Sequence, residues 1–245
     1  MNRYQPLLKQ ITLLVIGCSL SLSVFSQFGR EIYREDHDEK PYYFGLSLGY
    51  ANTYLAHSKS TNFLNTDTIM QILPGFSPAF SLGLMATLHP FRHFEFRLNP
   101  QLILGASRSF RYYLDSPMAN MGENKIEKRY VQSTIISMPL SVKFNSDRIQ
   151  NFRVYMLGGA HFDMDLASNA NSRNADAILK LKKFDYGIHA GIGFNFYLPF
   201  VTVSPEIKFV YGLSDLHSRN PALKYSNTLD RLSSRMIMFT LYLEE

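Results

Sequence analysis

Residues 42 to 54 decide the fold class, and they read Tyr-Tyr-Phe-Gly-Leu-Ser-Leu-Gly-Tyr-Ala-Asn-Thr-Tyr. Every even position from Tyr42 to Tyr50 carries a large apolar or aromatic side chain, whereas the odd positions from Gly45 to Ala51 carry small ones. Successive side chains of a β-strand point to opposite faces. The stretch is therefore predicted to be a strand with one large apolar face and one face of small residues.

The same period of two recurs along the rest of the chain. Seven further strands are predicted near residues 76–88, 94–104, 136–144, 152–166, 184–198, 201–211 and 235–243. Most of these eight segments are long enough to cross an outer membrane, which takes ~9–11 residues per strand. Four prolines fall inside them, namely Pro78, Pro100, Pro139 and Pro205. Because proline cannot donate to a strand ladder, we expect bulges or local gaps in pairing at these four sites.

The composition and the N-terminus indicate an exported protein. The 245 residues are 46% apolar and 18% charged, which excludes a disordered chain, and their one Cys excludes a disulfide scaffold. Residues 1–26 begin with Arg3 and Lys9, continue as an apolar run and end at Ser26, which is typical of a cleaved signal peptide. The alternative is lipidation at Cys18, which follows Val-Ile-Gly as in a lipobox.

The mature chain is predicted to span the membrane with strands. After residue 26 no apolar run approaches the ~20 residues that a transmembrane helix needs. The other structure that satisfies its backbone in lipid is a closed barrel. Loss of two basic residues with the signal peptide lowers the formal net charge from +5 to +3, which is too small to indicate a nucleic-acid partner.

The lengths of the connections alternate in the way that bacterial outer-membrane barrels require. Short turns are expected at 89–93, 145–151 and 198–200, and long links at 55–75, 107–129, 167–182 and 213–234. Short turns of such barrels are periplasmic and long loops are external, so both termini are expected in the periplasm. Aromatic residues gather near both predicted rims; Tyr42, Phe94, Phe144, Phe152, Tyr197 and Tyr242 lie near the short turns. A soluble eight-stranded barrel or sandwich with its apolar face inward is the alternative, because alternation along single strands does not separate the two.

The predicted fold is all-β: one eight-stranded antiparallel up-and-down transmembrane barrel with short periplasmic turns and long external loops. Residues 42–245 form the barrel domain, and residues 27–41 form a charged, flexible periplasmic segment ahead of it. Eight strands leave an interior that side chains only just fill, so a passive pore is not expected.

The inward face of the predicted strands carries charges of both signs. The residues are Glu95, Arg97, Lys143, Arg153, Asp163, Asp165, Asp185, Glu206 and Lys208. In a narrow lumen such charges must pair or be solvated, so we predict an interior salt-bridge network. No cofactor-binding motif is present, and we expect no cofactor and no catalytic residue.

A metal site is the alternative use of part of this face. If the hairpin between 152–166 and 184–198 is centred near residue 175, His161 faces His189 and Asp165 faces Asp185. With Asp163 they would offer two imidazoles and three carboxylates, which are metal ligands.

Four stretches of the chain resemble the PorT (SprT-type) outer-membrane barrels of the type IX secretion system. They are Arg97-Leu-Asn-Pro-Gln-Leu-Ile-Leu-Gly, with Arg108 and Tyr112 beyond; Gln132-Ser-Thr-Ile-Ile-Ser-Met-Pro-Leu-Ser-Val-Lys-Phe; Asn151-Phe-Arg-Val-Tyr-Met-Leu-Gly-Gly-Ala, with Asp165-Leu-Ala-Ser; and Ser204-Pro-Glu-Ile-Lys-Phe, with Gly212-Leu. None is a catalytic fingerprint, so the likeness depends on their sum.

The resemblance implies a non-enzymatic role in exporting cargo proteins across the outer membrane, and in relatives also gliding motility. It implies membrane lipid and other secretion proteins as partners, with cargo contacted indirectly and no nucleic acid. An outer-membrane lipid-modifying enzyme, such as a lipid A deacylase or acyltransferase, and a structural barrel without a secretion role are the alternatives.

Overall fold

A computed structural model describes residues 31–59, 69–106, 108–114, 126–131, 133–167, 181–218 and 229–245. The chain divides into two compact units, residues 1–33 and 34–245, and the fold described below belongs to the second. The predicted signal peptide, Cys18 included, lies outside the described residues. Within the described part of the chain, no helix is long and apolar enough to cross a membrane.

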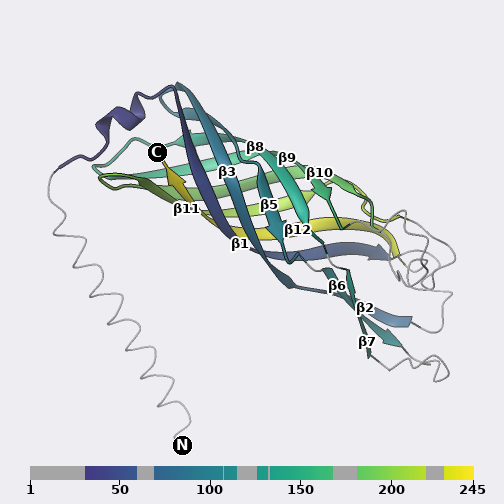
Figure 1. Cartoon of the computed structure of the whole chain (residues 1–245). Helices are drawn as coiled ribbons and strands as arrows, with labels where there is room; N and C mark the ends of the chain where they lie inside the picture. The colour runs from purple at the N-terminus through teal and green to yellow at the C-terminus, as the bar shows by residue number, and fades with distance from the viewer. Residues whose placement is uncertain are drawn as a thin grey trace, which may run out of the picture. The chain divides into compact units, whose positions relative to one another are not determined.

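A closed antiparallel ring of strands forms the second unit (Figure 1). Its members are β1 (Tyr42–Lys59), β3 (Ser77–Phe91), β4 (Phe94–Leu98), β5 (Gln101–Leu104), β8 (Ile135–Asn145), β9 (Phe152–Asp165), β10 (Phe184–Tyr197), β11 (Thr202–Gly212) and β12 (Leu229–Glu244). Strand β1 pairs with both β3 and β12, which closes the ring. Strands β4 and β5 both pair with β3 and β8 and together act as one interrupted strand. Counted in this way, the barrel wall has the eight strands that the sequence predicts.

The large apolar side chains of the wall point outward. In β1, Leu46 and Leu48 are 51% and 50% exposed, whereas Ser47 between them is buried. Leu48 is paired with Leu241 of β12 on one side and Leu82 of β3 on the other, so the apolar residues form a continuous outer band. A soluble barrel would bury these side chains and expose the polar ones. The arrangement is therefore that of a membrane barrel, not of the soluble alternative.

All four prolines lie where pairing lapses on one side of their strand, without a shift of register. Pro100 occupies the break between β4 and β5. Pro139 faces that break, because β8 pairs with β5 up to Ser137 and with β4 only from Leu140. The β10–β11 pairing lapses beside Pro205, and Pro78 precedes the first β3–β5 pair. The predicted gaps are confirmed, and they explain how a closed ring accommodates a residue that has no N–H.

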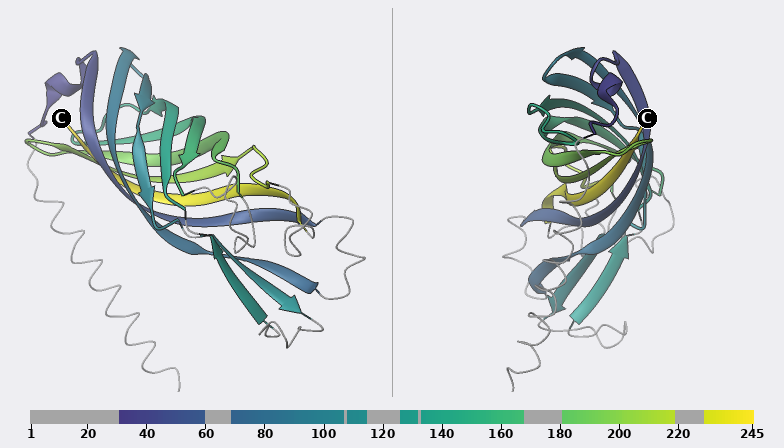
Figure 2. Two further views of the ribbon diagram at one scale, coloured as in Figure 1. Left: turned by 45° about the vertical axis from the view of Figure 1, so that its right-hand side comes forward. Right: turned by 90° about the vertical axis from the view of Figure 1, so that its left-hand side faces the viewer.

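The structure differs from the sequence prediction at the long-loop end. Links predicted as loops contain β2 (Ile69–Gly75), β6 (Arg108–Leu114) and β7 (Ile126–Val131), which form a separate three-stranded sheet. Strand β1 also continues to Lys59, and β12 begins at Leu229 instead of near residue 235. Figure 2 shows the three-stranded sheet leaving the barrel at this end. Strands beyond the apolar band need no lipid-facing side, so the alternation that marks the barrel strands is absent from them.

Replacing Leu48 with Arg places a charge in the middle of the outer apolar band. We expect the free energy of unfolding in lipid vesicles to fall by roughly 2–4 kcal/mol, because a cation at the midplane is unsolvated. Denaturant titration of Leu48→Arg and Leu48→Ile, the matched control, measures the difference. Equal stability of the two variants would show that this face does not contact acyl chains.

Candidate functional site

Arg97 occupies the centre of the barrel interior near the short turns. Strand β4 directs it inward, where its Nη2 lies 2.7 Å from Glu244 Oε1 and its Nη1 lies 3.4 Å from Glu206 Oε2. All three side chains are buried. The guanidinium carbon also lies 4.5 Å from the centre of the Tyr242 ring, within cation–π range. Arg97 therefore joins three strands across the lumen.

The Glu206 carboxylate of β11 is contacted by more donors than any other acceptor described here. Lys208 Nζ lies 3.0 Å from its Oε1, and the hydroxyls of Tyr155 and Tyr242 donate to its two oxygens at 3.0 and 3.2 Å. The Tyr155 ring fits only because residue 193 is Gly: a Cβ built there would lie 2.4 Å from the ring. A buried carboxylate needs such a set of donors to offset its lost hydration.

A second acceptor, Glu95, lies beside this group. Lys143 Nζ is 3.0 Å from Glu95 Oε2, and the Tyr43 hydroxyl donates to the same oxygen at 2.8 Å. Lys143 also lies 4.1 Å from the centre of the Tyr155 ring, which connects this pair to Glu206. We call Glu95, Arg97, Lys143, Glu206, Lys208 and Glu244, with Tyr43, Tyr155 and Tyr242, the central network.

The central network brings together five of the charged residues that the sequence indicates for the interior: Glu95, Arg97, Lys143, Glu206 and Lys208. Sequence reasoning missed Glu244 and the tyrosines. Tyr197 and Tyr242, assigned to the outer aromatic rim, are 1% and 0% exposed and face inward. The alternation along the strand could have shown this for Tyr242, because it lies between Leu241 and Leu243, which face outward.

Toward the long loops the interior is filled differently. A cluster of small and apolar side chains from six strands and the link after β5 occupies it: Ala51, Ala79, Ile103, Ala106, Ile135, Val210, Met236 and Met238. Together with the central network, these buried side chains occupy the interior at two levels. An eight-stranded barrel is expected to be filled in this way and to leave no aqueous channel.

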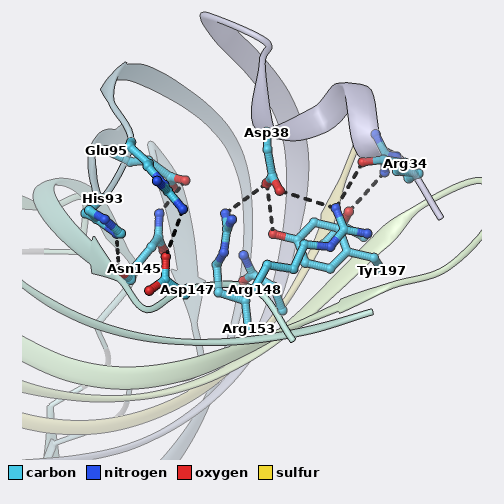
Figure 3. Close-up of polar contacts among 12 residues, drawn as sticks. Arg34, Asp38, His93, Glu95, Asn145, Asp147, Arg148, Arg153 and Tyr197 are labelled. Atoms are coloured by element: carbon cyan, nitrogen blue, oxygen red, sulfur yellow. Dashed lines mark hydrogen bonds and ion pairs between the residues drawn. The ribbon is translucent and has the colours of Figure 1, made fainter. Parts of the chain in front are cut away.

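A short N-terminal segment covers the short-turn end, shown in Figure 3. Residues Glu35–Asp38 form the 3-10 helix η1, where the sequence predicts a flexible segment. Asp38 lies 2.9 Å from Arg153 Nη1 and 3.4 Å from Arg148 Nη1, while Arg34 donates to the Glu244 carbonyl at 2.8 Å. We call residues 34–38 the N-terminal cover. Arg153, predicted as part of the interior network, thus pairs with the cover instead.

His37 is the buried residue of the N-terminal cover. Its ring lies 4.6 Å from the Tyr43 ring and 5.7 Å from the Tyr197 ring, and it is 3% exposed. Burial lowers the pKa of His37 from 6.5 to about 4, although the nearby Glu244 carboxylate opposes the shift. His37 is therefore neutral when the cover is in place at neutral pH.

The remaining predicted interior acids are buried nearer the long loops, apart from the central network. Asp165 accepts a hydrogen bond from the Ser133 hydroxyl, and Asp185 accepts from Ser214 and Ser234. Hydroxyls, not cations, satisfy these carboxylates. Asp163 is buried as well, and its Oδ2 lies 3.7 Å from Nε2 of His161 on the same strand.

The predicted register for the metal alternative is wrong by two residues. Asp163, not Asp165, is opposite Asp185, so His161 faces Gly187 and His189 faces Gly159. The two imidazole rings are 6.1 Å apart, and His189 Nε2 lies 2.8 Å from the Ser141 hydroxyl. Among the residues that the structure describes, no group of three His, Cys, Asp or Glu is placed to hold a metal ion.

Removing Arg97 tests the central network. Arg97→Met leaves Glu244 buried without its cation, so we expect a loss of roughly 3–5 kcal/mol in the free energy of unfolding. The control is Arg92→Met, which breaks the Arg92–Asp147 pair at 3.2 Å, with side chains 83% and 74% exposed. That loss should stay below about 1 kcal/mol. Comparable losses in both variants, measured in the same vesicles, would contradict the central role of Arg97.

Acid should release the N-terminal cover. Because the pKa of His37 is about 4 in the closed state and 6.5 as a free side chain, protons bind preferentially to the released state. Stability of the cover is complete above about pH 6.5 and is lost as the pH falls toward 4. Hydrogen exchange of residues 34–40, corrected for intrinsic rates, measures the release. His37→Phe keeps a ring without the titration, so an equal acid response in that variant would refute the prediction.

One known protein family matches most of the chain. A family model described as "Outer membrane protein beta-barrel domain" matches residues 25–218. A search of curated proteins found no match. Among solved structures, Neisserial surface protein A is similar at 13% identity, 82% coverage of this chain, 96% of that chain and a TM-score of 0.38. The attachment invasion locus protein Ail of Yersinia pestis, in complex with a heparin analogue, is similar at 11% identity, 84% and 100% coverage and a TM-score of 0.40.

LpxR from Salmonella typhimurium is also similar, at 8% identity, 80% and 99% coverage and a TM-score of 0.28. With identities of 8–13% and TM-scores of 0.28–0.40, these likenesses carry no argument about this chain. The family match, by contrast, covers most of the chain, from the end of the predicted signal peptide through β11. The chain belongs to the outer membrane protein beta-barrel domain family.

Proposed function

We propose that this outer-membrane barrel is a non-enzymatic component of a type IX protein secretion system, required for delivery of cargo proteins to the cell surface. In the same proposal the short turns and both termini face the periplasm, as expected for barrels with long external loops. The secretion role originates in the resemblance to PorT (SprT-type) barrels.

The observation that supports this proposal most directly is the placement of the stretches that carry the resemblance. They are far apart in the sequence, yet they supply Arg97, Lys143, Glu206 and Lys208 to the central network. Two of the prolines in them, Pro100 and Pro139, flank the same gap in the wall. The likeness thus falls on residues that build one interior, as expected if the chain shares the design of that family.

The filled interior favours an accessory role over a conduit. A folded or extended cargo chain cannot pass a lumen occupied by the central network and the apolar cluster. Among the residues that the structure describes, two parts at the barrel ends are candidates for contact with secretion partners: the N-terminal cover at one end and the sheet of β2, β6 and β7 at the other. Loops and short elements on a rigid scaffold commonly carry such contacts.

An enzymatic role in lipid modification has less support. Ser141 and His189 are within hydrogen-bond distance, but both are buried inside the barrel, whereas lipid lies outside it. The His189 Nδ1 has no hydrogen-bond partner among the described residues, so no acid orients this imidazole as a catalytic triad would require.

Deletion of the gene should leave cargo proteins in the periplasm while the outer membrane stays intact. Proteomics of surface and periplasmic fractions, with the deletion strain complemented by the intact gene as control, measures the effect. Lipid A masses should be unchanged, and the reconstituted protein should give no conductance in planar bilayers. Normal surface delivery in the deletion strain would refute the secretion role, and altered lipid A would favour the enzyme.

A further inference from the structure

Two arginines continue the outer face of β12 beyond the apolar band. Outward positions of this strand alternate, so the exposed Ile237 and Phe239 are followed toward the long loops by the half-buried Arg235 and the exposed Arg231. Ser233 between the two arginines is buried. At ~3.3 Å per residue, Arg235 lies roughly 7 Å past Ile237 along the strand. Arg235 thus lies just beyond the outer apolar band, on the side of the long loops.

Both guanidinium groups are held in position by the protein. Arg235 stacks on Tyr211, with its Cζ 3.2 Å from the ring centre, and donates to the Gly212 carbonyl at 2.9 Å. Arg231 donates to the Leu213 carbonyl at 2.5 Å. These acceptors are neutral, and no described carboxylate forms an ion pair with either arginine. Each guanidinium has five N–H groups, so donors remain for an anion.

A pocket adjoins these arginines. It has a volume of about 340 Å³, and its described lining residues include no carboxylate: Ala56, His57, Ser58, Tyr211, Leu213, Arg231 and Ser233. Serine hydroxyls and a guanidinium are suitable donors for phosphate oxygens, and Arg binds phosphate with two parallel hydrogen bonds. Tyr211 connects the pocket to Arg235, which stacks on its ring.

We propose that this pocket, with Arg231 and Arg235 as its cations, binds the phosphate group of a membrane lipid. A lipid is favoured over free phosphate because the outer face below the pocket is apolar: Phe209 and Ile237 are 58% and 46% exposed. The acyl chains of a lipid whose phosphate occupies the pocket would cover these side chains, which free phosphate leaves bare. The proposal is independent of the secretion role, but the choice of lipid A as the lipid rests on the proposed orientation, in which the long loops are external.

Native mass spectrometry of the whole mature protein in neutral detergent tests this proposal with lipid A as the probe. We expect lipid A to bind the Arg231→Gln, Arg235→Gln double variant roughly thirty-fold more weakly than the unmodified chain, because each cation contributes ~1 kcal/mol. Dephosphorylated lipid A should bind the unmodified chain and the double variant equally, and as weakly as lipid A binds the double variant. The matched control is Arg92→Gln, an exposed arginine at the opposite rim, which should bind as the unmodified chain does.

Equal binding of lipid A to the double variant and the unmodified chain would overturn the proposal, as would equal binding of the dephosphorylated lipid. Displacement of lipid A by low millimolar inorganic phosphate would overturn the choice of a lipid as the ligand. If the double variant fails to fold, judged by its heat-dependent migration in gels, Arg231→Gln alone is used. Its affinity for lipid A is expected to fall about fivefold. An unchanged affinity in that variant would also overturn the proposal.

Discussion

In a hydrocarbon environment every backbone N–H and C=O must find its partner within the protein, and this constraint determines the wall of the barrel. Strand β1 satisfies it by pairing on one side with β3 and on the other with β12. Once the wall is closed, the side chains have only two destinations, the lipid or the lumen. The alternation of large and small residues in β1 is the imprint of those two environments on the sequence.

The lumen presents the opposite problem, because charges there are shielded from water. Arg97, Lys143 and Lys208 are compensated by Glu95, Glu206 and Glu244, and tyrosine hydroxyls donate further hydrogen bonds to Glu95 and Glu206. Buried ion pairs contribute little net stability compared with apolar packing, but loss of one partner is costly. The central network therefore mainly selects one arrangement of the interior side chains near the short turns. The apolar cluster occupies the interior toward the long loops.

The sequence predicts the eight barrel strands well because lipid on one side and a narrow lumen on the other force a period of two. It fails where that demand ends. Strands β2, β6 and β7 have no lipid-facing side, and so no alternation marks them. The register between β9 and β10 depends on a link whose length does not reveal its centre, which is why the proposed facing of His161 and His189 was wrong. The N-terminal cover was missed because a charged segment such as residues 29–40 is usually solvated, whereas here Asp38 finds two arginines.

The position of Glu244 makes an interior ion pair depend on the pairing of the barrel strands. This residue reaches Arg97 only when β12 has paired with β1 and β11, since its place in both ladders sets its side chain inward. The β1–β12 pairing joins distant parts of the chain, and such long-range pairings form slowly. Until they form, the guanidinium lacks its nearest counter-charge, and an incomplete wall would hold that group beside acyl chains. Charge balance in the central network and completion of the seam are therefore coupled in the assembly of this barrel.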